Sequence, residues 1–371
     1  MATYYVRTDG HDTASGANNT NDASTGAFIS PGKAASVAVS GDTIYVKSGT
    51  YTLTTSTPGA LGPVLLANAA KILMEGFNTS PGDLGTPPVI IAGSLTALPY
   101  IVKSQAGVSN NQLIVNISVS GNNQATPGGS AGSGNIGFLG AATYGSVFWL
   151  CNAFNCGTEG FNGVQGTCIA CIADTNAVGF LAVNNTNMLY GCVARNNTSY
   201  GFSLQTGRCV RCIAYSNGGN GFDLGFNDSC CACISYANTG AGFHTATYSV
   251  NPIIDCIAYN NTTYQFDNST FNDMSIINCA ADNSHSGDLH TALLRSAGGG
   301  SGTSGLIRLT GDPFVNAPTD FSLNNTAGAG ALLRAAALAV AGGQLQNNDL
   351  GAVQSTAAAA GGLLRGGFWG G

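Results

Sequence analysis

A repeat between Cys151 and Asn283 constrains this chain more than any other feature of the sequence. Its marker is a cysteine that returns at intervals of 20, 21, 20, 21, 23 and 23 residues, at Cys151, Cys171, Cys192, Cys212, Cys233, Cys256 and Cys279. Five residues after the marker stands an asparagine, at Asn176, Asn197, Asn217, Asn238 and Asn261. Nine or ten residues after it stands a phenylalanine, at Phe161, Phe180, Phe202, Phe222, Phe243 and Phe266. Near-copies of this length, in register, predict a solenoid.

The period favours a coil of parallel β-helix. It is too short for two helices in each repeat, and the leucine signature of leucine-rich repeats is absent. Asparagine tolerates the left-handed conformation of tight bends, and its amide can bond to the same residue one coil above. Equivalent residues then stack at the strand spacing of ~4.8 Å, which predicts ladders of cysteine, asparagine and phenylalanine.

The repeat also resembles the right-handed parallel β-helix family, the pectate-lyase-like superfamily. The resemblance extends to the opening Tyr4–Gly10 and Gly41–Val46, and to the closing Asp312–Asn316 and Asp349–Gln354. It implies an all-β, single-stranded right-handed β-helix of roughly ten coils. The same fold carries lyases, hydrolases, phage tailspikes and inert spacers, so the resemblance implies little about function.

Segment by segment, we expect a capping opening over 1–60 and a β-helix over 61–283, most regular over 151–283. The opening includes a short helical turn near Ala34–Val39. A closing segment follows over 284–355, with a helix near 329–341, and then a low-complexity tail over 356–371. Each coil buries its core on its neighbours, so the solenoid needs no division into globular domains.

Charge and hydropathy exclude two classes of partner. Lys and Arg number 12 and Asp and Glu 18, which is 8% of the 371 residues, with a net charge of −6. The basic residues are scattered along the sequence, which argues against nucleic-acid binding. No apolar run reaches the ~18 residues of a membrane span. The first residues lack the basic and apolar regions of a signal peptide. We therefore expect a protein made without a classical signal and released in a particle.

The cysteines include a sequence that mimics a zinc site. Cys209-x-x-Cys212 and Cys230-x-x-Cys233 have the spacing of a four-cysteine site. Other coils place Ile, Leu or Phe at the position of Cys230, so these residues fill volume. We expect reduced, metal-free thiols and no cofactor, with zinc and a disulfide as the alternatives.

The cysteine-bearing strand is apolar on both sides, so one side must face outward. Residues expected on the second face are Cys209, Ile213, Tyr215, Ile234, Tyr236, Ile257 and Tyr259. Such a stripe indicates an interface. We predict a homotrimer or a larger array, with Ile213, Tyr215, Ile234, Tyr236, Ile257 and Tyr259 at the contact. The alternative is that the C-terminal segment of the same chain covers the stripe.

The best catalytic candidates are Asp223, His244 and Asp267, which follow Phe on successive coils, as Ser203 does one coil earlier. In register, the two carboxylates would be about 9.5 Å apart, the separation of an inverting glycosidase pair with a water between them. Polar outward residues are also ordinary on such a fold. The family resemblance implies a lyase with a basic residue beside a calcium-binding acidic cluster, and neither is evident.

Two further clusters are weaker metal candidates. Asp282, His285, Asp288 and His290 lie just past the last regular coil, and His11 stands between Asp9 and Asp12 in the opening.

Three functions remain open. We expect first a structural protein of an extracellular particle, such as a phage fibre, spike or decoration protein that contacts itself, other virion proteins or a surface glycan. The alternatives are a polysaccharide hydrolase or lyase that uses Asp223, His244 and Asp267, and a bacterial surface or filament protein.

Overall fold

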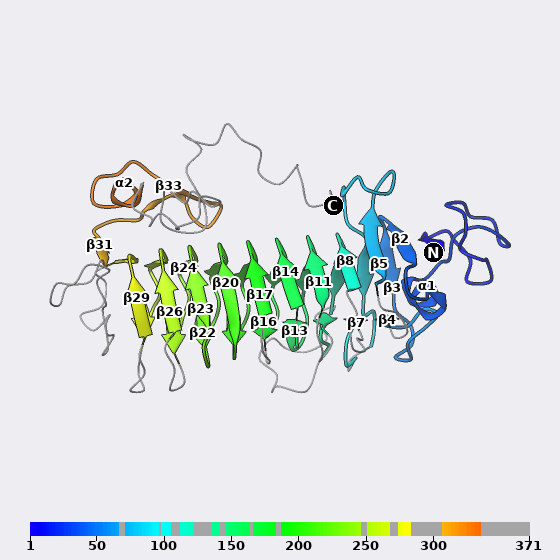
Figure 1. The fold of residues 1–371 in the computed structure, drawn as a ribbon, viewed down its shortest axis with the longest axis horizontal. Coiled ribbons are helices and arrows are strands. Elements are labelled where there is room, and N and C mark those ends of the chain that lie inside the picture. Colours follow the sequence, from blue (N-terminus) through cyan, green and yellow to red (C-terminus); the bar gives the residue numbers. More distant parts are fainter. Residues whose placement is uncertain are drawn as a thin grey trace.

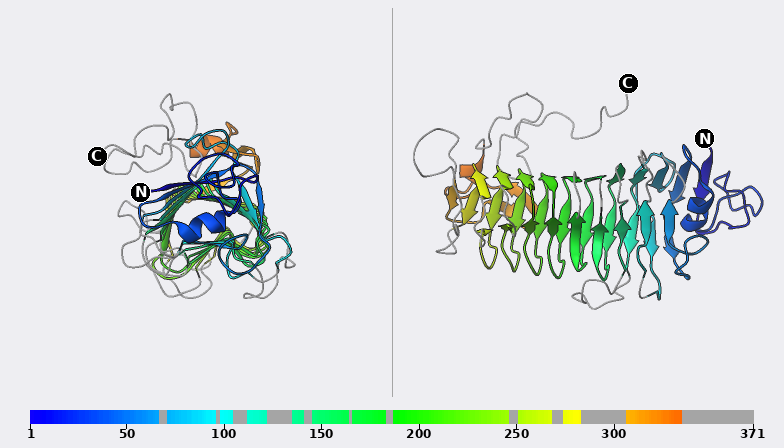
Figure 2. Two further views of the ribbon diagram at one scale, coloured as in Figure 1. Left: turned by 90° about the vertical axis from the view of Figure 1, so that its right-hand side faces the viewer. Right: turned by 60° about the horizontal axis from the view of Figure 1, so that its bottom comes forward.

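The computed structural model describes residues 1–66, 71–95, 98–104, 112–121, 135–140, 145–163, 166–182, 187–245, 251–267, 274–282 and 306–334. Within them the chain is nearly all β and forms a right-handed parallel β-helix, as predicted (Figure 1). Three parallel sheets run the length of the helix and enclose its core (Figure 2). No helix in these ranges is long and apolar enough to span a membrane.

A complete coil contributes one strand to each sheet, in the order A, B, C. Sheet A contains β1 (Thr3–Val6), β2 (Thr43–Lys47), β5 (Leu73–Phe77), β8 (Gln112–Val115), β11 (Ser146–Trp149), β14 (Gly166–Ile169), β17 (Asn187–Tyr190), β20 (Gly207–Val210), β23 (Ser229–Cys231), β26 (Asn251–Ile254) and β29 (Met274–Ile277). Sheet B contains β3 (Thr50–Thr52), β6 (Val89–Ile91), β9 (Ser118–Ser120), β12 (Asn152–Phe154), β15 (Ile172–Asp174), β18 (Val193–Arg195), β21 (Ile213–Tyr215), β24 (Ile234–Tyr236), β27 (Ile257–Tyr259), β30 (Ala280–Asp282) and β31 (Ile307–Leu309). Sheet C contains β4 (Val64–Leu66), β7 (Val102–Ser104), β10 (Phe138–Leu139), β13 (Glu159–Asn162), β16 (Val178–Ala182), β19 (Phe202–Leu204), β22 (Phe222–Leu224), β25 (Phe243–Thr245) and β28 (Phe266–Asp267).

The N-terminal segment is part of the solenoid as well as its cap. β1, β2 and β3 already belong to sheets A and B, so the β-helix starts before residue 61, where we expected it to begin. The helix α1 (Pro31–Val37) lies across the end of the coil (Figure 2). Ser30 caps α1, because its side chain accepts a bond from the Lys33 backbone N–H. α1 thereby buries Ala34 and Ala35 against the first coils.

The corners between the sheets depend on single left-handed residues. One stands just before each marker cysteine, where sheet A turns into sheet B, as at Arg211 with φ 55°. Another stands four residues after the cysteine, as at Asn196 with φ 53°. The ladder asparagines come one position later, so the expectation that they adopt the left-handed conformation themselves is wrong. Only some of the left-handed residues are glycine or asparagine, which removes the usual sequence signal for a bend.

Each left-handed corner also resets the alternation of side chains. Cys209, Cys212 and Ala214 all point into the core and are fully buried, while Val210 and Ile213 between them point outward. A continuous strand would place Cys209 on the same face as Ile213, as we expected from the sequence. Cys209 therefore leaves the outward stripe and joins the core.

The core is built from the predicted ladders. The rings of Phe138, Phe161, Phe180, Phe202, Phe222, Phe243 and Phe266 stack with centroids 4.7 to 5.3 Å apart and interplanar angles of 5° to 13°. In the asparagine ladder, the Asn197 side-chain amide donates to Oδ1 of Asn217 at 2.9 Å and to the Ala173 carbonyl at 3.3 Å. The Asn197 backbone N–H also donates to Asn217 Oδ1. Asn197 thus links three coils.

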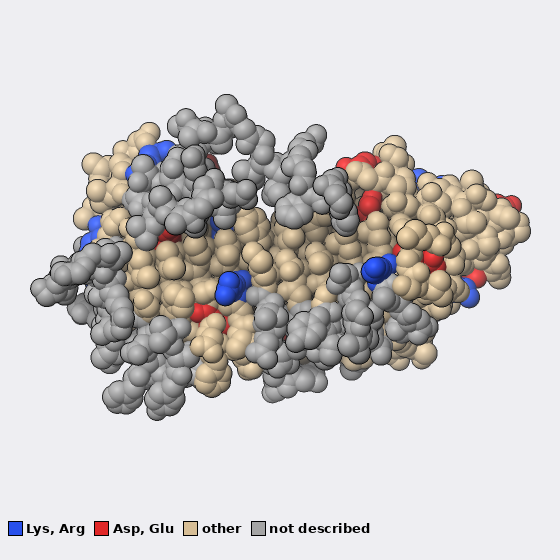
Figure 3. Space-filling model, viewed as in Figure 1, with Lys and Arg blue, Asp and Glu red and all other residues tan. Residues whose placement is uncertain are grey.

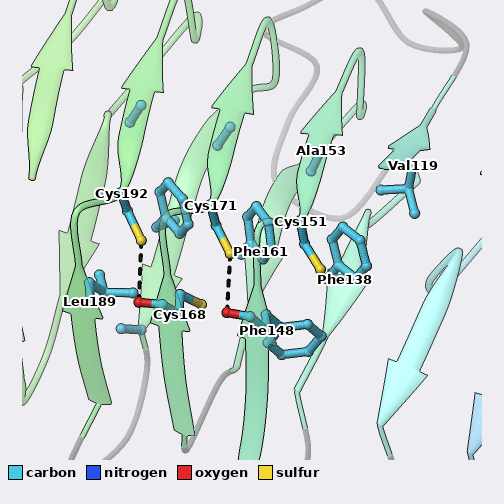
Figure 4. Close-up of a cluster of buried hydrophobic side chains, with 14 of the residues drawn as sticks. Val119, Phe138, Phe148, Cys151, Ala153, Phe161, Cys168, Cys171, Leu189 and Cys192 are labelled. Carbon is cyan, nitrogen blue, oxygen red and sulfur yellow. Dashed lines mark hydrogen bonds between the residues drawn. The ribbon is translucent and has the colours of Figure 1, made fainter. Parts of the chain in front are cut away.

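The cysteine ladder is a column of buried thiols. The Cys171 thiol donates to the Phe148 carbonyl at 3.3 Å and the Cys192 thiol to the Cys168 carbonyl at 3.4 Å (Figure 4). All twelve cysteines are free in the structure, and eleven of them are buried. Burial raises the pKa of Cys156 to about 12, which keeps this thiol protonated and unreactive.

The C-terminal segment folds back over the outside of sheet B. An antiparallel hairpin of β32 (Phe314–Asn316) and β33 (Asp320–Leu323), followed by the short helix α2 (Gly330–Leu333), lies beside the last coils (Figure 1). Phe321 packs 5.4 Å from the Tyr215 ring and 5.5 Å from the Tyr236 ring, centroid to centroid. The expected helix over 329–341 is therefore four residues long within the described part of the chain, which ends at Arg334.

This hairpin contacts the stripe that we predicted to be a subunit interface. Ile234, Ile257 and Tyr215 are buried with Phe314 and Phe321 in one cluster, and Ile213, Tyr236 and Tyr259 pack against that cluster. The same chain therefore supplies the cover, which is the alternative left open by the sequence. Self-association through this stripe loses its main support, and the oligomeric state itself stays a prediction.

Candidate functional site

The outward face of sheet C brings the three predicted residues into one column. Phe222, Phe243 and Phe266 point into the core, so the residue after each of them points outward. Asp223 pairs in register with His244, and His244 with Asp267. Ser203 lies beside Asp223 on the preceding coil.

The imidazole of His244 lies between the two carboxylates. Its Nδ1 is 2.6 Å from Oδ1 of Asp223, and its Nε2 is 3.9 Å from Oδ2 of Asp267. An ionised carboxylate only accepts hydrogen bonds, so Nδ1 carries the proton and donates to Asp223. In the neutral ring Nε2 then has a lone pair, on the side that faces Asp267.

The surroundings favour the charged form of His244. The hydrogen bond to Asp223 raises the pKa of His244 above its usual 6.5, partial burial opposes this, and the charges of Asp223 and Asp267 add to the rise. All three side chains are about one-fifth exposed or less, so solvent screens these interactions only in part. The folded protein therefore holds the proton of His244 more tightly than an isolated histidine does.

The position of His244 corrects one expectation. The register of Asp223 and Asp267 two coils apart is as predicted, but the space between them holds an imidazole. An inverting glycosidase pair needs that space for a water. The arrangement is instead a carboxylate–histidine–carboxylate cluster.

Sequence reasoning missed two kinds of residue beside this column. Asn220 donates to Oδ1 of Asp223 at 3.1 Å, and its own Oδ1 accepts from the Ala241 backbone at 2.9 Å. Tyr200 and Tyr264 occupy the same position on other coils, two residues before the phenylalanine, and both are partly exposed. Asp223 and partial burial raise the pKa of Tyr200. Aligning that position across the repeat would have found them.

The remaining candidates have structural roles or lie outside the described residues. Asp12 accepts bonds from the backbones of Ile29 and Ser30, and Asp9 forms an ion pair with Arg7 at 2.8 Å. Asp282 is buried and accepts from the Asn260 backbone.

His285, Asp288 and His290 lie outside the described residues, as does the tail over 356–371. In the described part of the chain, no three His, Cys, Asp or Glu side chains are grouped as metal ligands would be.

The backbone as a whole is similar to that of pectate lyase Pel9A. The match covers 95% of this chain and 96% of that one, with a TM-score of 0.55 and 16% sequence identity. The likeness establishes the fold. A rhamnogalacturonan lyase matches at a TM-score of 0.45, and the A-module of a mannuronan C-5 epimerase from Azotobacter vinelandii at 0.41. No protein-family model and no curated protein sequence matches the chain.

Proposed function

We propose that the outward face of sheet C binds a glycan and that His244, oriented by Asp223, transfers a proton during its cleavage. The observation that carries the proposal is the placement of the His244 ring between Asp223 and Asp267, with Nδ1 2.6 Å from Asp223. A carboxylate that accepts from one ring nitrogen fixes the tautomer and leaves the other nitrogen for substrate or water. Asp267 is then the second acid–base group of the site.

Residues beside the cluster support a sugar as the ligand. Tyr200, one coil before Asn220, and Tyr264, two coils after it, are partly exposed aromatic residues. A ligand site typically combines a few placed polar groups with aromatic surface. Gly219 keeps the Tyr200 ring close to the sheet, because a Cβ at Gly219 would come within 3.2 Å of that ring.

The charge of the face selects the class of glycan. The cluster carries two carboxylates, and the nearest basic residue of the same outward column is Lys103, five strands away from Asp223. Carboxylates repel the uronate groups of pectin-like polymers when no cation lies between them. We therefore propose an uncharged or amino-sugar polymer as the substrate and hydrolysis as the reaction.

A cleavage assay on paired substrates tests this proposal. We expect the protein to release reducing ends from an uncharged or amino-sugar polysaccharide and to leave polygalacturonate intact. Asp223→Asn, His244→Gln and Asp267→Asn should each lower the rate by roughly 10²-fold or more, as for loss of a proton-transfer group. Ser229→Ala, on the outward face of sheet A and so outside the proposed site, is the control and should keep the rate. Unsaturated products from polygalacturonate would contradict the proposal, as would equal activity in all four variants.

A second candidate is a structural role on the surface of an extracellular particle, such as a phage virion. The observation that favours it is the outward face of sheet A, which presents apolar side chains on coil after coil. A regular apolar face on a long solenoid suits assembly with other proteins. This role can be tested by labelling the protein and separating intact particles by chromatography. A virion component must elute together with the particle.

A further inference from the structure

The outward face of sheet A carries one long column of side chains. In register from β1 to β29 it contains Tyr5, Tyr45, Glu75, Val115, Trp149, Ile169, Tyr190, Val210, Cys231, Ile254 and Ile277. All of these residues except Val115 are partly exposed. Met188, in the parallel column two residues earlier on each strand, is 44% exposed. Figure 3 views this face and shows few charged atoms along it.

We propose that a second copy of this chain packs against sheet A, face to face and with its coil axis reversed. The twofold axis would run along the strand direction, between β11 and β14. Trp149 of one copy would then lie opposite Ile169 of the other. This contact is separate from the glycan site on sheet C and does not depend on it.

The repeat of the face favours a second copy over an unrelated partner. Side chains of the column recur at the strand spacing of ~4.8 Å over the whole length of the helix. Ridges with that period fit into the grooves of a surface that has the same period, and a second copy provides one. A twofold contact between identical faces closes after two subunits.

The size of the face is sufficient for a stable dimer. Eleven strands at ~4.8 Å span about 50 Å, and the outward residues of each strand span about 12 Å. That footprint is on the order of the ~800 Å² that each partner contributes to a standard specific interface. Two flat sheets can approach to about 10 Å with their side chains interleaved.

Charge selects the reversed orientation. The strands of sheet A contain three charged residues, Lys47, Glu75 and Arg208, and Lys47 lies at the corner near Asp9. Glu75 is on the third strand of the sheet and Arg208 on the eighth. The proposed axis, between the fifth and sixth strands, exchanges the third with the eighth. Each Glu75 then faces the partner's Arg208, offset by two residues along the strand, which a long arginine side chain spans. If the two coil axes ran in the same direction, each strand would face the same strand of the partner, and like charges would face each other.

Sedimentation of the full chain with charge-reversal variants tests the proposal. We expect a dimer at micromolar concentration, with Glu75→Arg and Arg208→Glu each weakening dimerisation at least tenfold by placing like charges together. The double variant Glu75→Arg/Arg208→Glu should restore it to within about threefold, because the pair is only exchanged. Lys103→Glu, on the outward face of sheet C, is the charge control and should have no effect. Circular dichroism would show that each variant remains folded.

Four outcomes would overturn the proposal. A wild-type chain that stays monomeric at the highest soluble concentration excludes the interface. A trimer excludes the twofold arrangement. A dimer that neither single variant weakens uses another face, and a double variant as weak as the singles excludes the reversed orientation.

Discussion

The two faces of the sheet C strands use the repeat in opposite ways. Inward, seven coils place phenylalanine at one position, and the rings stack into a single column. Outward, the next residue changes from coil to coil, and among the described strands of sheet C a polar run is formed only by Ser203, Asp223, His244 and Asp267. The inward face holds neighbouring coils together, so the same residue recurs on it and one coil predicts the next. The variable face has no such constraint, which leaves it available for a site.

The largest effect should come from breaking the inward face. Phe222→Ala removes a fully buried ring that stacks on both Phe202 and Phe243, and should lower the free energy of unfolding by about 3–5 kcal/mol. Asp223→Ala, one residue along and outward, should cost about 1 kcal/mol or less. Chemical denaturation of both variants measures the difference. If the two unfold at the same denaturant concentration, the inward and outward faces have been assigned incorrectly.

A second, smaller loss should follow from opening the asparagine ladder. Oδ1 of Asn217 accepts from both the backbone N–H and the side-chain amide of Asn197. Asn217→Ala leaves these two donors buried without an acceptor, so we expect a loss of about 2–3 kcal/mol. Asn220→Ala is the matched control, because Asn220 is the same residue type at a partly exposed position. Equal losses in the two variants would mean that the buried ladder contributes no more than a surface asparagine.

The C-terminal hairpin buries outward positions of sheet B. Phe321 is 6% exposed and packs on Tyr215 and Tyr236. Phe321→Ala should therefore cost about 2 kcal/mol, less than a core ring because the cover is a surface layer. Leu332→Ala, at a residue that is 46% exposed, should change stability by less than about 0.5 kcal/mol. A Phe321→Ala variant as stable as Leu332→Ala would show that the hairpin contributes little to folding.

The repeat allowed the fold, the ladders and the column of Asp223, His244 and Asp267 to be predicted, because each depends on counting positions within a coil. The corners could not be counted in the same way. Arg211 and Asp255 hold left-handed positions that sequence reasoning gives to glycine or asparagine, and each such residue shifts the alternation of the strand that follows. For that reason Cys209 was placed outside when it lies in the core. The role of His244 also depends on side-chain rotamers, which no spacing specifies.

The smallest effect concerns the outward face alone and depends on pH. The Asp223 hydrogen bond raises the pKa of His244 in the folded protein above its usual 6.5. A raised pKa means that the folded state binds the proton more tightly, so this contribution to stability is complete below about pH 6.5 and is lost as the pH rises through the folded pKa. The stability advantage of the wild-type protein over His244→Gln should thus be larger at about pH 5 than at about pH 9.

In an Asp223→Asn background most of this pH dependence should disappear, because the group that contributes most to the raised pKa of His244 is gone. Thermal melts across that range measure it, and an advantage that grows with pH would mean that His244 is held neutral in the fold, so that its proton-transfer role would begin from the free base.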